Sequence, residues 1–116
     1  MLWQIATAFN LICTGTLTDE GTSLASPVSY EYRVDLKQRR YCIDHCAESI
    51  PIHSYNNQSI VFERGDWGES SVNRESGRYS SRTLWTDEMV EGQTYVLVME
   101  MQCERAVFTG LPLRKF

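Results

Sequence analysis

The sequence predicts an all-β domain, an antiparallel meander of about six to eight strands forming a small barrel, a curved sheet or a sandwich. In segment 30–37, YEYRVDLK, apolar and polar side chains alternate with a period of two, which is typical of a strand with one buried face. Segments 9–18 and 93–106 are also extended and apolar, and turn-forming residues separate such segments. We find no amphipathic helix of three turns or more.

The first strand is predicted at 9–18. Phe9, Leu11, Cys13 and Leu17 share one parity and are expected to face the core. Threonines dominate the opposite face, where they suit an exposed pleat and Ile12 is the apolar exception. Residues 19–27 are rich in Gly, Ser and Thr. We therefore expect a polar loop there, in which strand pairing stops.

The next segments indicate two strands joined by a turn. The second strand is predicted at 29–36, and the third is a short return strand at 40–43. Residues 44–57 are the least regular part of the chain, and we expect a loop that contacts the core through a few apolar side chains.

Three further strands are expected between residues 58 and 85. The first, at 58–64, should direct Ile60 and Phe62 inward. Segments 70–74 and 78–85 should then form a hairpin whose three-residue connection ends in a left-handed glycine.

The last predicted strand spans 93–106. It is apolar on both faces at its start, so we expect it to be central in the sheet or covered by loops. Before it, the acidic segment 86–91 could form one short helical turn with Thr86 as its N-cap. Pairing of the first and last strands would close a barrel.

At 116 residues, the chain is expected to contain a single β domain, residues 9–116. Residues 1–8 begin with an apolar run and end in Ala6-Thr7-Ala8, which has the small-residue form of a signal-peptidase site. One interpretation is that 1–8 is the remnant of a signal peptide. The alternative is that this segment simply leads into the first strand.

The charge balance excludes one broad class of function. A formal net charge of −4 argues against a nucleic-acid binder that works by neutralising phosphates. We also expect no transmembrane segment, because no apolar run approaches the ~20 residues that a spanning helix needs.

The cysteine count suggests covalent cross-links. The four cysteines can form two disulfides in three ways, and we favour Cys42–Cys46 as a local loop and Cys13–Cys103 as a link between the first and last strands. Disulfides would place the protein in an oxidising compartment, the periplasm or cell envelope. The alternative is a cytoplasmic protein with reduced, buried thiols.

The segment CIDHCAESIPIH offers a second interpretation of the cysteines. Cys42, His45, Cys46 and His53 carry the ligand types that zinc binds, although C-x3-C with an internal histidine matches no common zinc finger. A thiol activated by one of these histidines is a further alternative. The sequence has no G-x-S-x-G, H-E-x-x-H or phosphate-loop motif, so we lean away from an enzyme and expect no cofactor.

A candidate ligand surface lies on the predicted hairpin 70–85. Guanidinium groups gathered on one face would suit an anionic small molecule or an acidic patch of a partner. The alternative is a solvated edge strand whose charges prevent aggregation. The residues of this surface are Asn73, Arg74, Arg78, Tyr79 and Arg82.

Four segments, FNLICTGT, YRVDLKQRRYC, VNRESGRY and CERAVFTGLP, resemble those of a set of small uncharacterised bacterial proteins. The resemblance covers most of the chain. It implies an exported β-rich domain with the order strand, cysteine hairpin, Asn-Arg hairpin and cysteine-containing last strand. It implies no activity, cofactor or catalytic residue.

These observations lead to one main functional hypothesis. We expect a non-enzymatic, disulfide-stabilised, exported β domain that binds a small ligand or a protein partner. The alternatives are a zinc-binding or thiol-dependent protein that uses the loop from Cys42 to His53, and a cytosolic interaction module with reduced cysteines.

Overall fold

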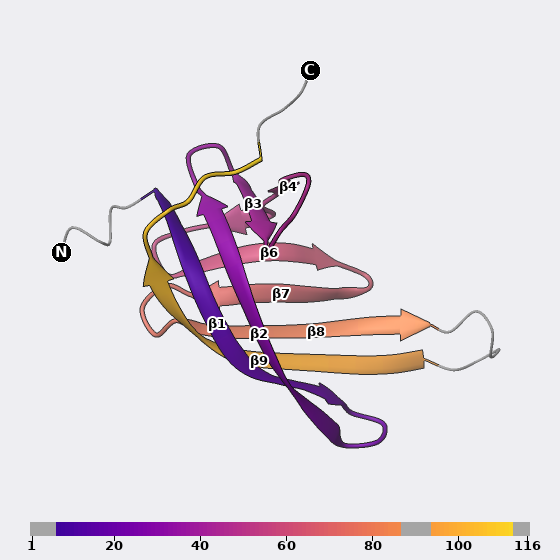
Figure 1. Cartoon of the computed structure of the whole chain (residues 1–116). Helices are drawn as coiled ribbons and strands as arrows, with labels where there is room; N and C mark the ends of the chain where they lie inside the picture. Colours follow the sequence, from indigo (N-terminus) through magenta and orange to yellow (C-terminus); the bar gives the residue numbers. More distant parts are fainter. Residues whose placement is uncertain (1–6, 87–93, 113–116) are drawn as a thin grey trace.

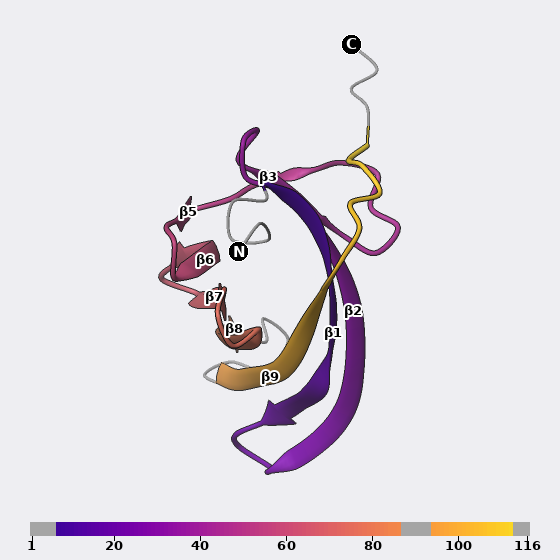
Figure 2. The same cartoon turned by 90° about the vertical axis from the view of Figure 1, so that its left-hand side faces the viewer.

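The computed structural model describes residues 7–86 and 94–112. In this part of the chain nine strands form one antiparallel sheet, and no helix occurs. The strand order is β4-β3-β2-β1-β9-β8-β7-β6-β5 (Figure 1). The sheet curls into a half-barrel with a concave and a convex face (Figure 2). The prediction of an all-β antiparallel domain is therefore confirmed, in its curved-sheet form.

The strands differ widely in length. Two of them, at the ends of the strand order, have only two residues each. The bounds are β1 (Ala8–Asp19), β2 (Leu24–Asp35), β3 (Arg40–Ile43), β4 (Ile50–Pro51), β5 (Ser54–Tyr55), β6 (Ser59–Gly65), β7 (Gly68–Asn73), β8 (Arg78–Thr86) and β9 (Thr94–Ala106).

The first and last strands pair in the middle of the sheet. The β1–β9 ladder runs from the Asn10–Ala106 pair to the Asp19–Leu97 pair. This contact does not close a barrel, contrary to our expectation, because β4 and β5, at the two ends of the strand order, do not pair with each other. The central position predicted for the last strand is confirmed, since β9 lies between β1 and β8.

The prediction of a polar loop at 19–27 is wrong. β1 continues to Asp19 and β2 begins at Leu24, so only a short turn separates them. Pro27 pairs with Thr16 on one side, while β3 reaches only the far end of β2. On this stretch β2 is an edge strand, and an edge tolerates a proline that cannot donate a ladder hydrogen bond.

The segment between β4 and β5 joins the two edges of the sheet. The Ile52 amide donates to the carbonyl oxygen of Arg39 at 2.9 Å, and the next amide, of His53, donates to Phe62 at 3.2 Å. These two residues therefore connect the β3 side to the β6 side. The short strands that flank them lie in the region where the sequence indicated an irregular loop.

The core occupies the concave face of the half-barrel. Its centre is a cluster of four aromatic rings, Tyr32, Tyr41, Phe62 and Tyr79, whose contacting centroids lie 4.7–6.2 Å apart. Burial, with the nearby Tyr79 as a second cause, raises the pKa of Tyr32. The surrounding apolar residues include most of those predicted to face inward from the first strand.

A β-bulge in β6 places two successive side chains on the concave side. The register with β7 shifts between Val61 and Glu63, so that Phe62 has no partner of its own. Phe62 is 1% exposed, and Glu63 hydrogen-bonds to Tyr41. Burial, followed by the Glu63 carboxylate, raises the pKa of Tyr41. The bulge thus adds a carboxylate to an otherwise aromatic surface.

Gly15 permits the bend of β1 that Figure 2 shows. A Cβ at this position would clash with the carbonyl oxygen of Glu100 and lie 2.6 Å from the Cα atom of Met101. The backbones of β1 and β9 therefore approach each other more closely here than a side chain would permit.

Two predictions fall wholly or largely outside the described residues. The helical turn expected at 86–91 lies there except for Thr86, which ends β8. The proposed signal-peptide remnant 1–8 is described only from Thr7, whose carbonyl oxygen accepts a hydrogen bond from the Leu36 amide at 2.7 Å.

Candidate ligand-binding site

A cavity of about 200 Å³ lies at one end of the half-barrel, between the β1–β9 wall and the β6–β7 wall. The start of β1, the end of β9 and the β7–β8 turn meet on this side of the molecule (Figure 1). The cavity is lined by Phe9, Leu11, Ile60, Val72, Asn73, Arg74, Glu75, Ser76, Gly77, Cys103 and Arg105.

The inner lining is apolar and rigidly held. Phe9 and Leu11 come from β1, while Ile60 and Val72 are neighbours in the β6–β7 ladder. All four belong to the buried core, so packing against their core neighbours holds them in place.

The β7–β8 turn forms one polar wall. The Asn73 side-chain oxygen accepts hydrogen bonds from the amides of Glu75 (2.9 Å) and Ser76 (3.0 Å). Gly77 has φ 75°, as predicted for a left-handed glycine in this hairpin, and its carbonyl oxygen accepts from the Cys103 amide at 2.8 Å. The turn is thus attached to β9 as well as to its own hairpin.

Cys103 links this wall to β1. It lies directly opposite Cys13 in the β1–β9 ladder, with a Cα–Cα distance of 4.0 Å, and the two sulfurs are at disulfide distance. A cross-link at this point would hold together two strands that both line the cavity.

Charged side chains surround the opening. Arg74 is partly exposed, and its Nη1 donates to the carbonyl oxygen of Asn56 at 2.8 Å. Arg105 is exposed and lies opposite Leu11 in the ladder. With Glu75 as the acidic lining residue, two guanidinium groups and one carboxylate surround the apolar interior.

The structure separates the five residues of the predicted arginine surface. Asn73 and Arg74 line the cavity. Arg78 and Arg82 are exposed on the opposite face of β8, and Arg82 pairs with Glu20 at 3.2 Å. Tyr79 is 4% exposed and belongs to the aromatic cluster. The β8 residues Arg78, Tyr79 and Arg82 therefore do not share one surface with Asn73 and Arg74.

Arg105 was not identified as a site residue from the sequence. The available signal was parity, because Arg105 shares the face of Met101 and Cys103 on the last strand. Its place beside Leu11 depends on the β1–β9 register, and that register cannot be read from either strand alone.

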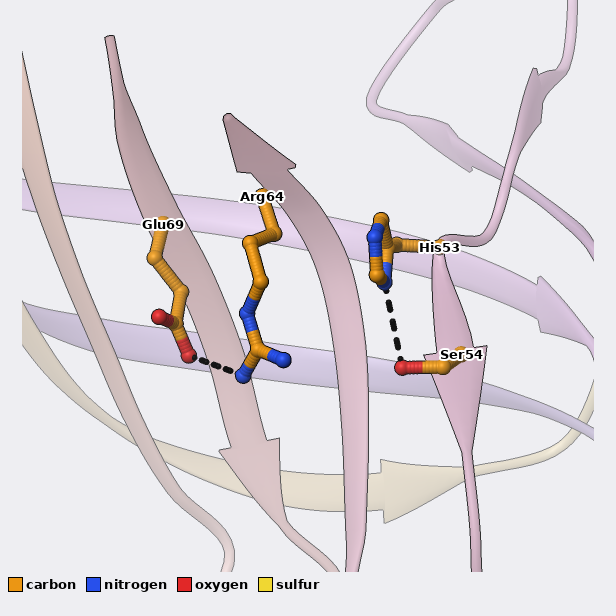
Figure 3. A network of polar contacts seen from close by, with 4 residues as sticks. All are labelled: His53, Ser54, Arg64 and Glu69. Carbon is orange, nitrogen blue, oxygen red and sulfur yellow. Dashed lines mark hydrogen bonds and ion pairs between the residues drawn. The ribbon is translucent and has the colours of Figure 1, made fainter. Parts of the chain in front are cut away.

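The predicted zinc ligands are also distributed over separate places. The sulfurs of Cys42 and Cys46 are at disulfide distance, and His45 is exposed in the loop between them. His53 lies between β4 and β5, where its amide donates to β6 and its Nδ1 is 3.2 Å from the hydroxyl oxygen of Ser54 (Figure 3). In residues 7–86 and 94–112, no three His, Cys, Asp or Glu side chains gather in a way that could hold a metal.

Beside His53, an ion pair joins Arg64 and Glu69 at 2.8 Å (Figure 3). The Arg64 hydrogen bond lowers the pKa of the Glu69 carboxyl, and the charge of His53 contributes in the same direction. Both partners are about half exposed, and such surface pairs contribute little to stability. We therefore assign this group no part in the candidate site.

No family model, curated protein or solved structure matches this chain. No helix in the described residues has the length and apolar character needed to cross a bilayer. The functional argument consequently depends on the geometry of the site itself.

Proposed function

We propose that this domain binds a small molecule with an apolar body and an anionic head in the cavity at the end of the half-barrel. The observation that carries the proposal is the combination of an apolar interior with Arg74 and Arg105 at the opening. Guanidinium groups pair well with carboxylates because they offer several donors in a fixed plane.

The volume restricts the apolar body to a small group. An apolar cavity of about 150 Å³ holds benzene. The cavity here, at about 200 Å³, therefore suits one aromatic ring or a short acyl chain. We propose monocyclic aromatic carboxylates and short-chain fatty acids as the ligand class.

If the two arginines bind the carboxylate, the affinity should depend on the charge of the ligand. Benzoate should bind, whereas the neutral benzyl alcohol and the cationic benzylamine should bind more weakly. Arg105→Gln should weaken benzoate binding about tenfold, because a hydrogen bond to a charged group contributes about 1.5–3 kcal/mol. Isothermal titration calorimetry, with amide chemical-shift mapping, measures both effects.

Arg78→Gln provides the matched control, since Arg78 is exposed on β8 and does not line the cavity. Its benzoate affinity should equal that of the unmodified protein. Equal loss in both variants, or shift changes confined to the convex face, would contradict the assignment of this cavity.

We also propose that the domain works in an oxidising compartment, the periplasm or cell envelope. Two cysteine pairs at disulfide distance support this location. Extraction of the native protein with thiols blocked, followed by mass mapping, should recover the Cys13–Cys103 link intact. Four blocked thiols would place the protein in a reducing compartment instead.

A further inference from the structure

The two cysteine pairs have different surroundings. Cys13 is fully buried and Cys103 is 5% exposed, and both belong to the core cluster. Cys42 is also fully buried, but Cys46 is partly exposed in the loop after β3. A thiol in solution therefore has access to one sulfur of the second pair and to neither sulfur of the first.

Arg33 lies next to both sulfurs of the exposed pair. It is directly opposite Cys42 in the β2–β3 ladder. Its Nη2 atom is 3.3 Å from the sulfur of Cys42 and 3.5 Å from that of Cys46. A cation at this distance stabilises a thiolate, which is the form that leaves when a disulfide is attacked.

The other hydrogen bonds of this guanidinium are to neutral acceptors. They are the carbonyl oxygens of Asp44, at 2.7 Å, and Gly110, at 3.2 Å. Ion pairs among residues 7–86 and 94–112 join Arg64 to Glu69 and Arg82 to Glu20, and neither includes Arg33. Its positive charge is thus directed at the sulfurs.

The loop that carries Cys46 is also attached to the sheet by hydrogen bonds. The Asp44 amide donates to the carbonyl oxygen of Glu31, and the Asp44 carboxylate accepts from the Glu31 amide, both at 2.8 Å. Figure 2 shows this loop on the outer side of the curled sheet, away from the core. The bond between the cysteines can therefore open while the loop stays in place.

We propose that Cys42 and Cys46 form a site of reversible thiol–disulfide exchange with low-molecular-weight thiols. An incoming thiolate attacks the sulfur of Cys46, the bond to Cys42 breaks, and the sulfur of Cys42 keeps the electron pair as a thiolate beside Arg33. A second thiolate then attacks the mixed disulfide on Cys46. The domain gains two thiols, and two external thiols are oxidised to one disulfide. This proposal is independent of the ligand cavity.

Glutathione buffers of graded potential, applied to the full chain, test the proposal. After alkylation and mass mapping, the Cys42–Cys46 bond should open at a potential where the Cys13–Cys103 bond stays closed. Far-UV circular dichroism should remain unchanged during this opening. Simultaneous opening of both bonds, or loss of structure with the first, would overturn the idea.

Arg33 variants test the role of its charge. Arg33→Gln should lower the equilibrium constant for reduction of the Cys42–Cys46 bond about tenfold. Arg33→Lys, which keeps the positive charge, should give an equilibrium constant close to that of the unmodified protein. Arg78 is remote from these cysteines, so Arg78→Gln should leave the equilibrium constant unchanged. An equilibrium constant unaffected in Arg33→Gln would refute the proposed stabilisation of the thiolate.

A second pair of variants identifies the attacked sulfur without altering Arg33. Cys42→Ser leaves the exposed Cys46, which should form a mixed disulfide with oxidised glutathione rapidly. Cys46→Ser leaves the buried Cys42, which should react at least tenfold more slowly. Equal rates would contradict the assignment of Cys46 as the point of attack.

Discussion

Replacing Cys13 and Cys103 together with alanine is expected to lower the free energy of unfolding by about 4–5 kcal/mol. The two residues are separated by 90 positions, so their bond restricts most of the unfolded chain. The chain-entropy relation gives a loss of about this size for a loop of that length. Since small domains have a total stability of about 5–15 kcal/mol, the double variant should lose at least about a quarter of it. Urea denaturation, followed by circular dichroism, measures the change.

The second cysteine pair provides an internal control. Cys42 and Cys46 are only four positions apart, and the same relation predicts a loss of about 2 kcal/mol when both become alanine. The long link should therefore matter more than the short one. An equal loss in the two double variants would indicate that loop length does not determine the effect here.

Phe62→Ala is expected to destabilise the domain by about 3–5 kcal/mol, the usual cost of removing a buried aromatic ring. The Phe62 ring lies 5.1 Å from that of Tyr32 and 4.7 Å from that of Tyr41, and it is 1% exposed. Its removal would leave a cavity among the rings of Tyr32, Tyr41 and Tyr79. Thermal and urea unfolding of the variant measure the loss.

Leu24→Ala is the appropriate comparison, because Leu24 is 72% exposed at the start of β2. It should change the stability by no more than about 0.5 kcal/mol. If Phe62→Ala changes the stability equally little, the aromatic cluster does not stabilise the core as we describe.

Much of the fold followed from alternation along single strands. The inward positions of Phe9, Leu11 and Cys13, and of Ile60 and Phe62, were predicted from parity and are buried in the structure. The pairing of the cysteines also agrees with the favoured connectivity. The inward positions are accessible because side chains on a strand alternate between two faces whatever the strand pairs with.

Other features depend on which strands become neighbours. The polar composition of 19–27 indicated a loop, but β1 supplies the partner that makes 24–27 a strand. Arg33 was treated as an ordinary polar residue of the second strand, and its place beside the sulfurs follows from the register with β3. The composition of a segment does not specify its register.

By itself, the sequence determined that this protein is an antiparallel β domain whose strands have one apolar face, because this property arises from local alternation. Only the tertiary structure decided that the sheet remains a half-barrel and that Arg74 and Arg105 meet at one cavity. The reason is that strand order and register, which bring strands distant in sequence together, depend on backbone hydrogen bonds that are largely independent of side-chain type.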